Sequence, residues 1–114
     1  MNIHFLEIVT KDVDKHVGVL STTLGVSFNG PVAEFGNAMV AVAPGGGRVS
    51  IRAPMHDEEA PTIRPYMLTN DIEAAVKSAE EAGAMIAMAP THVPGQGTFA
   101  IYFVDDAQLG LWQV

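Results

Sequence analysis

The stretch Thr10-Lys11-Asp12-Val13-Asp14 occurs again, fifty-nine positions later, as Thr69-Asn70-Asp71-Ile72-Glu73. In both copies an apolar run precedes a Thr-x-Asp corner. Apolar residues at helical spacing then follow until a glycine, Gly25 in the first copy and Gly83 in the second. A repeat of about half the chain length indicates two similar structural units. The sequence therefore predicts two strand-helix units and two similar half-sheets.

Length and composition indicate one folded domain. The chain has 114 residues, of which 48% are hydrophobic and 17% are charged, and it contains no cysteine. This composition is typical of globular proteins, and it excludes disulfides and thiolate metal sites. The sequence has no charged-then-apolar leader and no apolar run of about 18 residues. We therefore expect a soluble cytoplasmic protein without a membrane partner.

The charge of the chain bears on its partners. Thirteen acidic residues against six basic residues give a net charge of −7. A surface of this sign repels phosphate backbones, so nucleic acid is not an expected partner. The same charge attracts cations, which admits a cationic small molecule as ligand. Solubility alone is the simpler explanation of this charge.

The first half of the chain predicts a strand, a helix and three further strands. Asn2–Val9 is rich in large apolar and β-branched residues, which favour a strand. Asp12 is placed to cap a helix whose apolar stripe ends before Gly25. The remaining extended segments are expected at Val26–Phe35 with a break at Asn29–Pro31, at Ala38–Ala43 and at Arg48–Ala53.

The second half repeats this order after an acidic linker that contains proline. We expect module one at residues 1–54, the linker at 55–62 and module two at 63–114. Asn70 and Glu73 have the spacing of a capping box for the second helix, and Gly83 is expected to end it. The strands of module two are expected at Arg64–Thr69, Met85–Val93, Thr98–Val104 and Leu109–Val114.

Two modules of this kind resemble the vicinal oxygen chelate superfamily, which contains glyoxalase I, the extradiol dioxygenases and the bleomycin resistance proteins. The resemblance covers nearly the whole chain. It is carried by Thr10–Val13, Leu24–Val26 and the closing segment Phe103–Trp112, in which the usual Pro-x-Gly is missing. It implies an α+β fold of two βαβββ modules that form an incomplete barrel around a cavity. Such a resemblance indicates a fold and does not identify a reaction.

If the resemblance holds, the alternation along each strand separates cavity-facing from helix-facing side chains. Leu6 and Ile8 are expected to face the first helix. The strands are expected to contribute seven side chains to a ligand pocket, and His92 an eighth from near the Pro-Gly loop. The seven are Phe5, Glu7, Ser50, Arg52, Arg64, Tyr66 and Trp112.

The resemblance also implies where a metal would bind. Metal-dependent members carry one His, Gln or Glu ligand on each of four strands, and the corresponding positions here are Phe5, Ser50, Arg64 and Gly110. None of these side chains is a good ligand for a divalent metal, and the arginine would repel one. Preformed ligand spacing is also missing among the histidines, His4, His16, His56 and His92. We therefore expect no metal and no other cofactor.

Glu7 is the candidate catalytic residue. A carboxylate beside Phe5 and Trp112 in a half-apolar cavity could act as a general base, or as the counter-charge of a cationic ligand. The structural alternative is an ion pair with Arg52 or Arg64, and we weigh this alternative above catalysis.

Two classes of function follow. The first is a metal-free protein, similar to the bleomycin resistance proteins, that binds a small and possibly cationic ligand and forms a homodimer. A dimer would cover the sheet edge and apolar rim that a single chain of this size exposes. The second class is an enzyme, either a metal-dependent lyase, isomerase or dioxygenase, or a metal-free acid–base enzyme that uses Glu7 with Tyr66 or His92. The unsuitable side chains at the ligand positions favour the first class.

Overall fold

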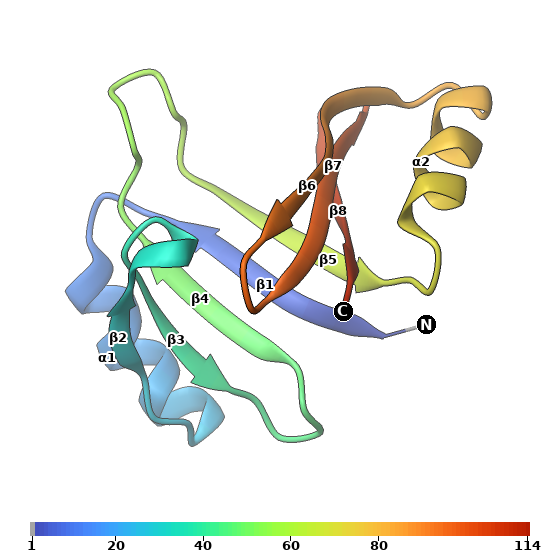
Figure 1. Ribbon diagram of the computed structural model, residues 1–114. Helices are drawn as coiled ribbons and strands as arrows, with labels where there is room; N and C mark the ends of the chain where they lie inside the picture. Colours follow the sequence, from blue (N-terminus) through green and yellow to red (C-terminus); the bar gives the residue numbers. More distant parts are fainter. Residues whose placement is uncertain (1) are drawn as a thin grey trace. The chain divides into compact units, whose positions relative to one another are not determined.

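The computed structural model describes residues 2–114, which form eight strands, two α-helices and one short 3-10 helix (Figure 1). These residues divide into two compact units, Phe5–Ile63 and Arg64–Val114, and the residues up to His4 belong to the second unit. Each unit places one α-helix against one face of a half-sheet. The predicted α+β fold with two βαβββ units is therefore confirmed. No helix within the described residues is both long and apolar enough to cross a membrane.

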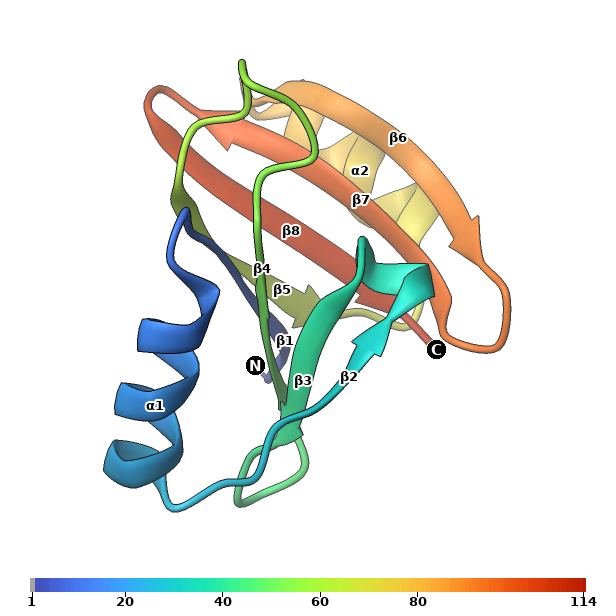
Figure 2. The ribbon, with the colours of Figure 1, turned by 90° about the vertical axis from the view of Figure 1, so that its left-hand side faces the viewer.

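The first unit follows the predicted order of elements. It contains β1 (Ile3–Val9), α1 (Val13–Leu24), β2 (Asn29–Val32), β3 (Ala38–Val42) and β4 (Arg48–Arg52). The strand order is β2-β3-β4-β1. β1 and β4 run parallel, whereas the other neighbours run antiparallel. Figure 2 shows α1 alongside these strands.

Both ends of α1 lie where the sequence predicts them. The Asp12 Oδ1 atom accepts a hydrogen bond from the Lys15 amide at 3.1 Å, which satisfies one of the free amides at the helix start. At the other end Gly25 has a φ of 65°, and its amide donates to the Ser21 carbonyl. This left-handed conformation favours glycine.

β2 contains the residues Asn29–Pro31, where the sequence predicted a break, whereas residues 26–28 of the predicted extended segment form no strand. β2 is an edge strand and pairs only with β3, with a shift of register between Asn29 and Val32. A proline is tolerated in an edge strand because its missing amide is not needed by a second neighbour. The last part of the predicted extended segment, Ala33–Phe35, is a 3-10 turn.

The second unit repeats the architecture of the first. It contains β5 (Thr62–Leu68), α2 (Ile72–Glu81), β6 (Met85–Val93), β7 (Gly97–Val104) and β8 (Ala107–Gln113). The strand order β5-β8-β7-β6 corresponds to β1-β4-β3-β2, and β5 and β8 again run parallel. β6 has its predicted bounds, whereas β5, β7 and β8 begin one or two residues earlier than predicted.

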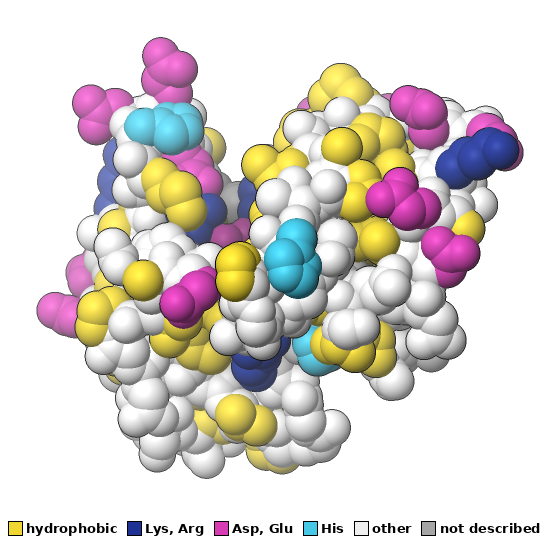
Figure 3. Space-filling view, in the orientation of Figure 1, with side chains coloured by type: hydrophobic (Ala, Val, Ile, Leu, Met, Phe, Trp, Pro, Cys, Tyr) yellow, Lys and Arg dark blue, Asp and Glu magenta, His cyan; other side chains and the backbone are white. Residues whose placement is uncertain are grey.

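Asp71 caps α2, and the predicted capping box of Asn70 with Glu73 is wrong. The Asp71 Oδ1 atom accepts a hydrogen bond from the Ala74 amide at 3.1 Å, as Asp12 does from Lys15 in α1. The amide of Ile72 donates to the Gln113 side chain at 2.8 Å. Charged side chains gather over α2 in Figure 3. They include an exposed pair, Lys77 and Glu81, whose charged atoms are 3.9 Å apart.

Each unit has its own apolar core between helix and sheet. In the first unit Ile8, Val49 and Ile51 pack against α1, which confirms that Ile8 faces this helix. In the second unit Ala100 and Leu111 pack with Ile72 of α2. Because strand side chains alternate, the residues between these core positions lie on the opposite face of each half-sheet. We call this opposite face the helix-free face.

Candidate functional site

The helix-free face of the first unit contains the pocket residues that were predicted in the first half of the chain. β1 and β4 run side by side with Phe5 opposite Arg48, Glu7 opposite Ser50, and Val9 opposite Arg52. The intervening residues of β4, Val49 and Ile51, belong to the core under α1. The members of the three pairs therefore share the helix-free face.

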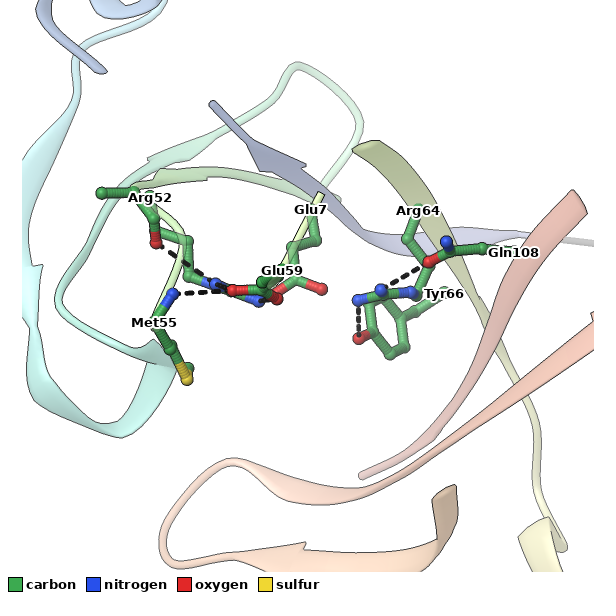
Figure 4. Close-up of polar contacts among 8 residues, drawn as sticks. Glu7, Arg52, Met55, Glu59, Arg64, Tyr66 and Gln108 are labelled. Carbon is green, nitrogen blue, oxygen red and sulfur yellow. Dashed lines mark hydrogen bonds and ion pairs between the residues drawn. The ribbon is translucent and has the colours of Figure 1, made fainter. Parts of the chain in front are cut away.

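Arg52 is the centre of an ion-pair network on this face (Figure 4). Its Nε atom donates to Glu7 Oε2 at 3.0 Å, and its Nη1 and Nη2 atoms donate to the two carboxylate oxygens of Glu59 at 2.7 and 2.8 Å. Arg52 is only 4% exposed. Hydrogen bonding to Glu59 raises the pKa of Arg52, and the same hydrogen bonds lower the pKa of Glu59 to about 2. Arg52 and Glu59 are therefore both charged at neutral pH.

The same network also forms hydrogen bonds to the backbone of the segment that follows β4. The Met55 amide donates to Glu59 Oε1 at 2.7 Å, and the Arg52 Nη1 atom donates to the Ala53 carbonyl at 3.2 Å. The predicted linker is thus folded back onto the end of β4. It forms one wall of a shallow hollow lined by Lys11, Ala53, Pro54, Met55, His56, Asp57 and Glu59.

The carboxylate of Glu7 is held in an ion pair. Its Oε2 atom lies 3.0 Å from the Arg52 Nε atom, and its side chain is 12% exposed. This is the structural alternative that the inward-pointing charges of Glu7 and Arg52 indicated. A general base needs a carboxylate oxygen within hydrogen-bond reach of its substrate, and the Oε2 atom of Glu7 is already engaged by Arg52.

Arg48 and Phe35 join this face, although neither was predicted from the sequence. The guanidinium carbon of Arg48 lies 5.4 Å from the centre of the Phe5 ring and 5.3 Å from that of Phe35. The two rings are 4.9 Å apart. These distances are typical of cation–π contacts. Desolvation by burial lowers the pKa of Arg48. Arg48 could have been predicted from the sequence, because it lies two residues before Ser50 on the same strand and therefore on the same face. Phe35 lies in a turn, where strand alternation makes no prediction.

Ser50 is the most enclosed polar residue of the face. It is 1% exposed, and its Oγ atom has no hydrogen-bond partner among residues 2–114. An enclosed hydroxyl without a partner is unfavourable because it has lost its hydrogen bonds to water.

In the second unit the helix-free face is aromatic. The Tyr66 and Trp112 rings meet edge to face with their centres 5.6 Å apart, and Phe99 stacks on Trp112 at 5.9 Å. The indole N–H of Trp112 donates to the Gln96 carbonyl at 3.0 Å. His4 lies against the same indole, with 5.9 Å between ring centres. The predicted pocket residues Tyr66 and Trp112 are therefore in mutual contact.

Arg64 is the charged residue of this aromatic face. It is 8% exposed. Its Nη2 atom donates to Gln108 Oε1 at 2.7 Å, and its Nη1 atom donates to the Tyr66 hydroxyl at 3.3 Å (Figure 4). Gln108 was not identified from the sequence, although it alternates along β8 with Gly110 and Trp112.

His92 lies apart from this aromatic cluster. It is exposed on β6 and pairs with Thr98 of β7. The next residues on that side of β7, Ala100 and Tyr102, pack in the core under α2. The register therefore places His92 on the helix side of the half-sheet, whereas its neighbour Thr91 pairs with Phe99 on the helix-free side.

The residues at the four implied metal positions do not fit a metal. Phe5 and Arg64 offer no electron pair to a cation. Gly110 has no side chain, and the Tyr66 ring lies against it so closely that an added Cβ would be 2.6 Å from the Tyr66 Cγ atom. Ser50 alone offers an oxygen. The described residues contain no cluster of three or more His, Asp or Glu side chains that could serve instead.

Comparisons with known proteins identify the fold. No family model matches the sequence, and no curated protein matches it. A hypothetical protein from Bacillus halodurans superimposes with a TM-score of 0.74 at 12% identity, over 99% of this chain and 94% of that chain. The methylmalonyl-CoA epimerase from Mycobacterium tuberculosis superimposes with a TM-score of 0.71 at 14% identity, over 96% of this chain and 85% of that chain.

A third solved structure with a similar fold is that of a metal-bound protein. The Mn(II)-bound glyoxalase from Novosphingobium aromaticivorans gives a TM-score of 0.72 at 20% identity, over 97% of this chain and 38% of that chain. At such identities a structural likeness establishes the fold and does not establish an activity. The chain has the glyoxalase-like fold of the vicinal oxygen chelate proteins.

Proposed function

We propose that this chain is a metal-free protein that binds a small molecule on the helix-free face of a half-sheet. The observation that carries the proposal is the set of residues at the implied metal positions, Phe5, Ser50, Arg64 and Gly110. Only one of the four has an oxygen donor, and stable sites for divalent metals use several donors. Aromatic walls with a few placed polar groups are typical of small-molecule sites.

The enzyme alternatives have less support. Metal-assisted chemistry needs donors that these four positions do not supply. Acid–base chemistry with Glu7 needs a carboxylate oxygen that contacts the substrate, and Arg52 engages this carboxylate in an ion pair at 3.0 Å. His92, its predicted partner, lies on the helix side of its half-sheet.

Metal analysis of the purified protein tests the proposal. After dialysis against a buffer with Mn²⁺, Ni²⁺, Zn²⁺ and Fe²⁺ and then against metal-free buffer, we expect far less than one metal ion per chain. Denaturing the protein should release a co-purified small molecule, which mass spectrometry then detects. One firmly held metal ion per chain would contradict the proposal.

We also propose that the protein is a homodimer. β2 and β6 lie at the ends of their half-sheets and pair with one neighbour each, and unpaired strand edges favour association. On β6, Met85 and Met88 are 61% and 42% exposed. Light scattering after size-exclusion chromatography should give twice the chain mass, and a single-chain mass at all concentrations would contradict a dimer.

A further inference from the structure

On the helix-free face of the first unit two arginines accompany two glutamates, although the chain as a whole has a net charge of −7. Its carboxylates, from Glu7 and Glu59, are both paired with Arg52. Arg48 adds a positive charge over the Phe5 and Phe35 rings. The formal charges of these four side chains therefore sum to zero, in contrast to the net charge of the whole chain.

Ser50 lies in the middle of this face. It is flanked along β4 by Arg48 and Arg52, and its neighbours on the adjacent strands are Glu7 and Val40. Its hydroxyl is the one polar group of the face that is enclosed and has no partner among the described residues. A hydroxyl can donate one hydrogen bond, and the guanidinium group of Arg48 on the same face favours a negatively charged acceptor.

Alanine at this position would avoid the cost of an enclosed hydroxyl without a partner. Residues that are unfavourable for folding are typical of functional sites. The enclosed hydroxyl is therefore a candidate for a hydrogen bond to a ligand.

We propose that Ser50 donates a hydrogen bond to the carboxylate of a flat small molecule, whose charge Arg48 balances and whose apolar part contacts Phe5 and Phe35. This inference rests on the proposed binding function and specifies its ligand class. Side chains of the face must move to admit the ligand, and Arg48 is suited to this because its long stem is flexible and only half-buried.

Three probes of equal size and different charge test the ligand class. Benzoate, benzamide and benzylamine are titrated into the ¹⁵N-labelled protein, and binding is followed from the amide signals of β1 and β4. We expect benzoate to bind about tenfold more tightly than benzamide, which is the factor of one charge-assisted hydrogen bond, and benzylamine to give no shifts. Tighter binding of benzylamine would overturn the inference, as would the absence of benzoate binding.

Variants then test the role of Ser50. Ser50→Ala should weaken benzoate binding about tenfold and raise the midpoint temperature of unliganded unfolding. Ser50→Thr, which keeps the hydroxyl, should retain more of the benzoate affinity, and the exposed Ser27→Ala should change neither quantity. Unchanged benzoate affinity in Ser50→Ala would show that Ser50 is not the donor.

The inference and the proposed function fail in distinguishable ways. Benzylamine binding with no metal uptake would overturn the carboxylate ligand and leave the metal-free binding function in place. Stoichiometric metal in the dialysed protein would overturn the function itself, whatever the three probes do.

Discussion

The helix-free face of the first unit is held together by ion pairs, whereas the same face of the second unit is held together by stacked rings. The registers make the comparison residue by residue. Glu7 and Tyr66 occupy equivalent places because they pair with Ser50 and Gly110. Arg52 and Trp112 are equivalent in the same way, since Val9 and Leu68 are their partners.

The faces toward the helices differ much less. Ile8 and Ile51 under α1 correspond to Met67 and Leu111 under α2, and all four are apolar. Packing against a helix admits only apolar side chains of suitable volume. The duplicated fold therefore keeps its two cores alike, and the helix-free faces are where the two halves carry different chemistry.

Removing the centre of the charged face should have the largest effect. Arg52→Met leaves the carboxylates of Glu7 and Glu59 side by side without their counter-charge. Losing one member of a buried ion pair costs about 3–5 kcal/mol, so we expect a loss of this size in the free energy of unfolding. Urea denaturation at pH 7 measures it.

The exposed ion pair of α2 provides the control. Lys77→Met breaks the contact with Glu81, in which both side chains are more than half exposed. Such pairs contribute about 0.5 kcal/mol or less. If Arg52→Met cost no more than Lys77→Met, the charged face would not be stabilised by its ion pairs.

Acid should weaken the charged face and leave the aromatic face unaffected. Hydrogen bonding to Arg52 lowers the pKa of Glu59 from 4.5 to about 2. Because the folded pKa is the lower one, Glu59 stabilises the fold fully above pH 4.5, and this contribution is lost as the pH falls toward 2. We expect it to amount to about 1–3 kcal/mol.

Comparing the wild type with Glu59→Gln measures this contribution. At pH 7 the variant should be less stable, and the difference should shrink between pH 4.5 and 2. Hydrogen exchange of the Met55 amide, which donates to Glu59 at 2.7 Å, should be faster in the variant. A difference in stability that does not change with pH would show that the charge of Glu59 is not what stabilises the segment.

Adding one methyl group to the aromatic face should destabilise the protein by less than Arg52→Met does. In Gly110→Ala the new Cβ would lie 2.6 Å from the Tyr66 Cγ atom, and Tyr66 is 3% exposed, so its ring has little room to move. Overpacking of this kind costs about 1–3 kcal/mol. Urea denaturation measures the loss.

Gly18→Ala is the matched control, since a Cβ at Gly18 of α1 meets nothing within 4 Å. Alanine is more favourable than glycine inside a helix by about 0.5–1 kcal/mol, so this variant should gain stability. If both variants gained stability, the Tyr66 ring would not lie against Gly110.

The predictions that succeeded depend on local patterns. The Thr-x-Asp repeat and the apolar stripes identified both helices, and strand alternation placed Phe5, Glu7, Ser50 and Arg52 on one face. These features are local because backbone geometry sets the spacing of side chains along one element. The resemblance drawn from the same repeat implied the glyoxalase-like fold, and the solved structures confirm it.

The residues that were missed depend on contacts between distant segments. Glu59 reaches Arg52 only because the segment after β4 folds back, and Phe35 reaches Phe5 from a turn that was expected to be extended. The sequence repeat already shows that Glu7 in the first unit corresponds to Tyr66 in the second unit. The consequence of this difference, a ring over Gly110, depends on the pairing of β5 with β8.

The helix starts should show the smallest effect, and there the two units should respond alike. Asp12 and Asp71 each accept an amide hydrogen bond at 3.1 Å. Replacing such a cap by alanine costs about 1 kcal/mol, so Asp12→Ala and Asp71→Ala should lose similar amounts in urea denaturation. Asn70→Ala should lose less than about 0.5 kcal/mol, because the Asp71 cap remains. If Asn70→Ala were the more damaging change, the capping box predicted from the sequence would stand, and the two helices would start differently.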